Sequence, residues 1–258
     1  MQAARSIELD QWDIDYFKRG EYEIPRFWAR LGGKPDLSNA HIVDIGCGHG
    51  SLCIDLALSG AKKVLGLDID AHLIEFANEN LRRNYPQLKS VLEFRNVDLR
   101  DYPELEFEVA VSKDTFEHIM DLEGMLGAIS SRLQPGGRIY AGFGPLYNAP
   151  SGDHGRTHTP TLWGHLLVPE QTIFERLNRH RKTTISSVHD LGLNGMSLQD
   201  YKRAFRESGL SVEYFRVNQG ALGPWPHQLV YAFASLLRKI PFLEEYFTIN
   251  IYCILEKR

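Results

Sequence analysis

The sequence predicts an α/β fold built on a seven-stranded, mostly parallel sheet with an antiparallel last strand and helices on both faces. Short β-branched apolar runs alternate with segments of helical periodicity along residues 39–144, as in a parallel sheet with crossover helices. The first run, 41–45, breaks into three glycines between 46 and 50 and continues into a helical pattern. The later segments 211–217 and 247–255 alternate between apolar and polar residues, which suits strands at an antiparallel edge.

Local signals place the other elements in order. Further strands are expected where short apolar runs meet turn residues, at 63–67, 91–97, 107–112 and 138–143. Helices are expected at 51–58, 71–85, 121–133, 197–208 and 226–239. Two short helices should precede the sheet, and the second should start near Pro25, because proline is favoured in the first turn of a helix. Ser197 and Gly209 should cap the two ends of one helix, and Pro135 should open a turn.

We expect a single domain over residues 1–258, made of consecutive parts: a helical cap (1–38), a ligand-binding core (39–144), an insertion (145–196) and a C-terminal part (197–258). The insertion leaves the carboxyl end of the sheet, so it should act as a lid or substrate-binding loop. The segment 220–245 should form an amphipathic helix. Its apolar face could roof a substrate, contact a dimer partner, touch a membrane surface or pack on its own domain.

Composition narrows the class of protein. The net charge is -4 and the estimated pI 6.2, with no run of Lys and Arg, which argues against nucleic-acid binding. The three cysteines form no metal or disulfide pattern, and the N-terminus lacks the apolar core of a signal peptide, so we expect a cytoplasmic protein. No apolar run approaches the roughly 18 residues of a transmembrane helix.

The glycine turn carries a signal about its ligand. Dinucleotide-binding turns place a third glycine where this chain has Ser51, and here a carboxylate, Asp44, stands two residues before the first glycine. That carboxylate would repel a pyrophosphate but suits an ammonium group. S-adenosylmethionine (SAM) carries an ammonium and no phosphate, so the turn favours SAM over NAD. Asp68, 20 residues after Gly48, is placed to hydrogen-bond ribose hydroxyls.

Two further acids have more than one interpretation. Asp70 is most simply the N-cap of the following helix. Asp98 ends the strand at 91–97 and could accept a hydrogen bond from an adenine amino group, or it could be a turn or cap residue.

Five segments resemble, in order, the motifs of class I SAM-dependent methyltransferases: VDIGCGHG (43–50), GLDID (66–70), NVDL (96–99), FEHI (116–119) and LQPGG (133–137). The resemblance covers residues 40–145 closely and 197–258 more loosely. It implies a Rossmann-like fold, SAM as cofactor and S-adenosylhomocysteine as product.

The resemblance also implies cofactor contacts from Tyr16, Asp44, Gly46, Cys47, Gly48, Asp68, Ile69, Asp98, Leu99 and Lys113. Asp44 would bind the ammonium, close to the glycines and the Lys113 backbone at the methionine end. Asp68 would hold the ribose, and Ile69 would pack on the adenine. Tyr16 lies in a leader that covers the cofactor in related enzymes, but it could equally pack on the sheet.

Histidines are the candidate catalytic residues. A hydroxyl acceptor usually needs a base for methyl transfer, and histidine titrates near neutral pH. We expect His118, His154 or His158 to line the acceptor pocket with one as the base, although each could be a structural histidine. His154 and His158 have the spacing of a helical metal-ligand pair, but the surrounding glycines and prolines predict no helix, so no metal is expected.

The leading hypothesis is O-methylation of a small, partly apolar molecule. The segment 112–115 lacks the Asn/Asp-Pro-Pro-aromatic turn of amino-directed DNA methyltransferases, and the two insertions are rich in aromatic residues. The alternatives are methylation of carbon or nitrogen in a small molecule and a non-catalytic SAM-binding protein. The expected partners are a small-molecule acceptor and, through 220–245, a second copy of the chain.

Overall fold

The computed structural model describes residues 9–102, 105–179, 184–220 and 225–258. Its sheet has seven strands in the order β3-β2-β1-β4-β5-β7-β6, and β7 runs antiparallel to its neighbours, which confirms the predicted fold class. The strands are β1 (His41–Ile45), β2 (Lys63–Asp68), β3 (Leu92–Asn96), β4 (Phe107–Lys113), β5 (Leu133–Phe143), β6 (Ser211–Val217) and β7 (Ile251–Glu256).

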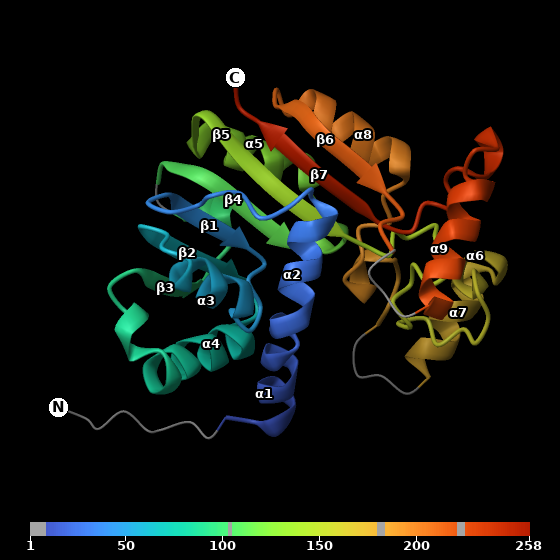
Figure 1. Cartoon of the computed structure of the whole chain (residues 1–258). Coiled ribbons are helices and arrows are strands. Elements are labelled where there is room, and N and C mark those ends of the chain that lie inside the picture. The colour runs from blue at the N-terminus through green and yellow to red at the C-terminus, as the bar shows by residue number, and fades with distance from the viewer. Residues whose placement is uncertain (1–8, 103–104, 180–183, 221–224) are drawn as a thin grey trace. The chain divides into compact units, whose positions relative to one another are not determined.

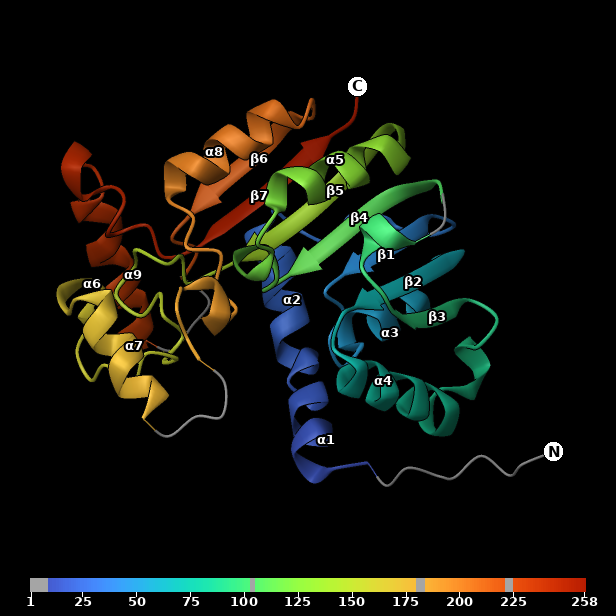
Figure 2. The same cartoon turned by 180° about the vertical axis from the view of Figure 1, so that it is seen from behind.

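The helices of the described residues are shown in Figures 1 and 2. The α-helices are α1 (Gln11–Lys18), α2 (Gly20–Arg30), α3 (Ser51–Leu58), α4 (Ala71–Asn84), α5 (Leu122–Arg132), α6 (Gly164–Leu167), α7 (Glu170–Asn178), α8 (Leu198–Glu207) and α9 (Trp225–Leu237). The short 3₁₀ turns are η1 (Pro86–Leu88), η2 (Leu99–Asp101), η3 (Phe116–His118), η4 (His189–Leu191) and η5 (Pro241–Leu243).

The chain divides into two compact units, which we describe separately. The first unit extends to Lys113 at the end of β4 and includes residues 128–140 and 256–258. The second unit comprises residues 114–127 and 141–255.

The first unit contains four parallel neighbouring strands, β3-β2-β1-β4, with α3 and α4 packed against β2 and β3 (Figure 1). The central strand β1 is an apolar run because both of its faces are covered: Ile42, Val43 and Ile45 are all buried. On β2, Gly66 leaves room for the Phe94 ring of β3 and for Cys53 of α3. Close packing of α3 on the sheet positions the glycine turn at the helix N-terminus.

Three predicted boundaries are wrong. Helix α2 begins at Gly20, not near Pro25, and Pro25 lies inside it. An interior proline costs a helix about 3 kcal/mol, and burial of Phe27 and Trp28 on the same helix offsets that cost. Strand β5 begins at Leu133 rather than at 138, because the expected glycine turn pairs through its backbone with Lys257.

Strand β7 begins at Ile251 rather than at 247. The side chain of Asn218 takes the place of a strand partner there: its amide donates to the Phe247 carbonyl at 2.8 Å, and its carbonyl accepts from Ile249 N–H at 2.7 Å.

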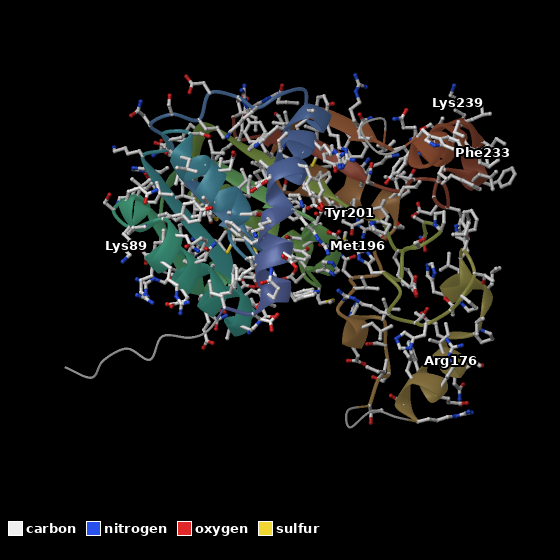
Figure 3. The ribbon with its side chains drawn as sticks, turned by 60° about the horizontal axis from the view of Figure 1, so that its bottom comes forward. Lys89, Arg176, Met196, Tyr201, Phe233 and Lys239 are labelled. Atoms are coloured by element: carbon white, nitrogen blue, oxygen red, sulfur yellow. The ribbon has the colours of Figure 1, made fainter. Side chains whose placement is uncertain are left out.

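In the second unit, residues 145–196 contain α6, α7 and η4 between irregular segments. Buried Ile173, Leu177, Ile185 and Leu191 give this part its own small core. After it, Ser197 and Asp200 form the predicted capping box of α8, which carries the fully buried Tyr201 labelled in Figure 3.

Helix α9 confirms the helix predicted in segment 220–245, but most of its apolar side chains face outward. Ala234 is buried with Ala149 and Ile249, whereas Phe233 projects away from the helix (Figure 3). Phe233 and Leu229 are each 60 % exposed. The roles suggested for this face, including dimer contact, stay predictions.

We predict that Gly66→Ala destabilises the protein, because the added Cβ would lie 2.6 Å from the Phe94 ring and 2.9 Å from Cys53 Sγ. The expected loss is roughly 1–3 kcal/mol of unfolding free energy, measured by urea denaturation. The matched control is Gly127→Ala in α5, where an added Cβ meets nothing within 4 Å. That helical substitution should be neutral or stabilising by up to about 1 kcal/mol. Equal stability of Gly66→Ala and wild type would contradict the packing described.

Candidate functional site

The glycine turn after β1 is tied to the end of β2. Gly46, Gly48 and Gly50 all have positive φ, at 73°, 52° and 80°, which glycine adopts without strain. The Gly46 and Cys47 amides donate to the Leu67 carbonyl at 2.8 and 3.0 Å. A Cβ on Gly48 would meet nothing within 4 Å, so the turn presents an open backbone edge there.

Asp68 is held against this turn, at the carboxyl end of β2. Its Oδ2 accepts from the Gly48 N–H at 2.8 Å and its Oδ1 accepts from the Asp70 N–H at 2.9 Å. The next residue, Ile69, is 78 % exposed, so an apolar side chain lies free beside the carboxylate. Asp70 accepts from the His72 and Leu73 amides, which confirms it as the N-cap of α4. The predicted roles of Asp68 and Ile69 toward ribose and adenine stay predictions.

Asp44 is a buried acid at the carboxyl end of β1, only 2 % exposed. It accepts a hydrogen bond from Cys53 Sγ at 3.1 Å. Burial raises the pKa of Asp44 to about 7, with a smaller contribution in the same direction from the negative charge of Asp68. A bound cation would return the carboxylate to its ionised form.

Asp98 acts as a cap. It accepts from the Arg100 N–H at 2.8 Å and binds the Arg100 guanidinium, which lowers the pKa of the Asp98 carboxyl. The cap interpretation is confirmed, and contacts of Asp98 and Leu99 with adenine stay predictions. Lys113, at the end of β4, forms an ion pair with Glu23 of α2 at 3.1 Å.

A buried carboxylate fastens the N-terminal helix to the glycine turn. Asp13 of α1 is 2 % exposed and bridges two imidazoles, His49 Nε2 at 2.9 Å and His72 Nε2 at 3.0 Å. The Tyr16 ring lies 4.7 Å from the His49 ring, centroid to centroid. Tyr16 therefore packs against a residue of the turn, and its contact with a cofactor stays a prediction. The sequence did not identify Asp13, because its partners are distant in the chain.

In the second unit, two of the three predicted catalytic histidines lie together. His118 Nδ1 is 2.7 Å from the Gly192 carbonyl oxygen, and His154 Nε2 is 2.9 Å from that of Pro145. The two rings are edge-to-face with centroids 5.0 Å apart. Burial lowers the pKa of both imidazoles, which favours their neutral forms.

A buried acid that the sequence did not single out as functional completes this group. Glu117 is 3 % exposed, and its Oε1 accepts from the Gly144 N–H at 2.9 Å. A candidate ligand atom from each of Glu117, His118 and His154 lies within 4.8 Å of the other two. The exposed His158 is not part of this group in the described chain. Residues 154–157 form turns and His158 lies in no helix, as the glycines and prolines predicted, and both histidines have φ near 53°.

Two residues of the 145–196 insertion form hydrogen bonds that hold the segments around Glu117 and His118 in place. Asn194 Nδ2 donates to the Phe116 and Ile119 carbonyls at 2.8 and 3.2 Å, so it binds both ends of the segment that carries Glu117 and His118. Arg156 donates through Nη1 to the Leu191 and Gly192 carbonyls. The motif FEHI marked this segment in the sequence, but its partners in the insertion could be found only from the structure.

Among the described residues, no helix has the length and apolar content needed to cross a membrane.

Comparison with known proteins agrees with the motifs. Residues 36–143 match a family model described as a methyltransferase domain. The chain is 26 % identical over 203 residues to 27-O-demethylrifamycin SV methyltransferase of Amycolatopsis mediterranei, covering 78 % of this chain and 65 % of that one. It is 34 % identical over 105 residues to ribosomal protein L11 methyltransferase of Pseudomonas fluorescens, covering 40 % and 34 %. The chain thus spans less than two thirds of each of these relatives.

The fold is also similar to a solved structure of geranyl diphosphate C-methyltransferase from Streptomyces coelicolor, with a TM-score of 0.59 and 17 % identity. That similarity covers 100 % of this chain and 86 % of the other. Residues 36–143 therefore form a methyltransferase domain, and the fold of the chain is similar to that of SAM-dependent methyltransferases.

We predict that Asp13→Asn weakens the attachment of α1 to the glycine turn, because an amide has one accepting oxygen and cannot accept hydrogen bonds from both the buried His49 and the exposed His72. The expected loss is about 1–3 kcal/mol in unfolding free energy, with a changed fluorescence of Trp12, whose ring lies 5.8 Å from that of His49. Asp15→Asn, an exposed acid on the same helix, should change neither quantity. An Asp13→Asn variant with wild-type stability and fluorescence would show that the bridge does not hold α1.

Proposed function

We propose that the protein transfers the methyl group of SAM to an oxygen of a small, partly apolar molecule, releasing S-adenosylhomocysteine. The observation that carries this proposal is the pair of carboxylates at the carboxyl ends of β1 and β2. Asp44 and Asp68 flank a positive-φ glycine turn there, and Gly48 donates to Asp68. A ligand with a cationic end and a ribose suits this arrangement, whereas the pyrophosphate of a dinucleotide would lie close to the Asp44 carboxylate.

Asp44 suits the ammonium of SAM because a buried carboxylate has little water around it and therefore attracts a cation more strongly than an exposed one does. The free carboxyl gains a proton more readily than an exposed acid, and a cation would replace that proton. Ile69 is exposed next to Asp68 and can cover one face of the adenine. Tyr16 lies on the glycine turn through its contact with His49 and can enclose the cofactor from the N-terminal side.

A small acceptor is supported by the names of two of the similar proteins, since rifamycin SV and geranyl diphosphate are small molecules. The third is named for a ribosomal protein, but it covers only 40 % of this chain. The longest of these sequence matches therefore favours a small-molecule acceptor.

We assign proton removal from the acceptor hydroxyl to the histidine pair. His118 and His154 are each oriented by a backbone carbonyl, and Glu117 lies beside them. His118 follows Lys113 by five residues in the chain, within the motif that the family carries after its fourth strand. Methylation of nitrogen or carbon is the alternative, because a neutral amine needs no base.

The choice between oxygen and nitrogen can be tested with acceptor pairs that share one aromatic skeleton and differ only in a hydroxyl or an amino group. We expect S-adenosylhomocysteine release with hydroxyl acceptors, reduced about 10²-fold or more in a His118→Asn, His154→Gln double variant. Methylation confined to amines, at equal rates in both proteins, would favour the alternative. SAM binding without release for any acceptor would favour a non-catalytic protein.

We predict that SAM binding weakens as the pH falls below about 7. The ammonium of SAM requires ionised Asp44, but the free carboxyl has a pKa of about 7, so at lower pH binding must first displace a proton. The dissociation constant should rise about tenfold for each pH unit below 7. Calorimetry in buffers of different ionisation enthalpy would measure the proton released. Asp44→Asn should bind SAM weakly at every pH, and a wild-type affinity independent of pH between about 5.5 and 7.5 would contradict this role.

A further inference from the structure

The group formed by Glu117, His118 and His154 has the composition of a metal site. Two imidazoles and one carboxylate offer ligand atoms that all lie within 4.8 Å of one another. We propose that these three side chains bind one divalent transition-metal ion, of the Zn²⁺ or Mn²⁺ type, and leave coordination positions open for the oxygen of the acceptor.

The hydrogen bonds of the two histidines determine which nitrogens can bind an ion. A carbonyl oxygen only accepts, so His118 Nδ1 must carry the proton that it donates to Gly192, and His154 Nε2 the one that it donates to Pro145. The lone pairs therefore lie on His118 Nε2 and His154 Nδ1. A metal-binding histidine typically donates its other ring nitrogen to a carbonyl or carboxylate, which fixes its tautomer and orientation. Both rings already have this arrangement.

The charges around the group leave room for a cation. Asp114 and Arg156 both act on the two imidazoles. Asp153 also acts on His154, and Arg156 also acts on Glu117. Glu117 then supplies a negative charge at a position that is 3 % exposed. A divalent ion would add to the compensation that Arg156 gives this buried charge.

The two nitrogen ligands and one oxygen ligand indicate which metal ions the site would prefer. Imidazole nitrogens favour zinc, copper, iron and nickel, whereas magnesium, calcium and manganese prefer oxygen ligands, so the two imidazoles favour zinc and the carboxylate also suits manganese. Atoms bound to one zinc ion lie about 3.3 Å apart, so the three side chains would close together by up to about 1.5 Å on binding. Three protein ligands leave at least one position open, as catalytic rather than structural sites do.

The catalytic consequence rests on the proposed function. An acceptor hydroxyl bound to the ion would have a lowered pKa and would lose its proton to solvent. The oxygen then attacks the SAM methyl group; the new O–C bond forms as the S–C bond breaks, and neutral S-adenosylhomocysteine leaves. With an ion bound, His118 and His154 act as its ligands. The ion then activates the acceptor hydroxyl, a role that we otherwise assign to a histidine base.

Metal binding can be measured without knowledge of the acceptor. Untagged protein is stripped of metal by chelation and dialysis, and then titrated with Zn²⁺ and with Mn²⁺ by calorimetry, with bound metal counted by elemental analysis. We expect one ion per chain for at least one of the two metals. Its affinity should fall by 100-fold or more in Glu117→Gln, His118→Asn and His154→Gln.

These substitutions distinguish the loss of a metal ligand from the loss of a structural hydrogen bond. An asparagine amide can reach the position of Nδ1, and a glutamine amide that of Nε2, so His118→Asn and His154→Gln can keep their bonds to Gly192 and Pro145. Glu117→Gln keeps an oxygen for the Gly144 N–H. The matched control is His189→Ala, since His189 is an exposed histidine of the same unit, and it should bind metal like wild type. Thermal unfolding of each variant verifies that it is folded.

Three outcomes would overturn the proposal: no stoichiometric ion, affinity unchanged in all three variants, or full methyl-transfer activity of metal-free protein. In each case a separate measurement of SAM binding would show whether the proposed methyltransferase function still holds without the metal site. Conversely, stoichiometric metal with no SAM binding would support the metal site and remove the proposed methyl transfer.

Discussion

The hydrogen bond from the Gly48 amide to Asp68 is the contact on which the cofactor site depends. It joins a turn that only glycine adopts without strain to the last residue of the neighbouring strand. Two more amides of the turn donate to the Leu67 carbonyl, so the turn and the end of β2 form one rigid unit. The spacing between the glycines and the carboxylate that we propose for ribose is thereby set before any ligand arrives, and little ordering remains to oppose binding.

Buried carboxylates recur at each functional position, and each has a different partner. Asp44 accepts from the Cys53 thiol, and we propose that it binds a cation. Asp13 already has two imidazoles and serves to fasten α1 to the turn. Glu117 lies between an amide donor and the two histidines of the second unit. Because a buried charge is costly unless it is paired, we base the role proposed for each acid on its partner: a cationic ligand for Asp44, attachment of a helix for Asp13 and a metal ion for Glu117.

Local signals in the sequence predicted the features that depend on neighbouring residues. The glycine turn, the Asp70 cap and the capping box at Ser197 were all placed correctly, since their partners lie within a few residues. The groups around Asp13 and Glu117 could not be predicted, because each joins segments tens of residues apart. Sequence spacing paired His154 with His158, whereas the fold pairs His154 with His118. The boundary error at Pro25 has the same origin, since burial of Phe27 and Trp28 overrides a local preference.

The central claim is that this turn and its carboxylates bind SAM. Calorimetric titration of the protein with SAM, S-adenosylhomocysteine and NAD, alongside Asp68→Ala and the exposed-acid control Glu75→Gln, tests it directly. We expect micromolar binding of SAM and S-adenosylhomocysteine, no binding of NAD, a loss of about tenfold or more in Asp68→Ala and none in Glu75→Gln. Binding of NAD, or wild-type SAM affinity in Asp68→Ala, would contradict the assignment of the glycine turn and its two carboxylates to SAM.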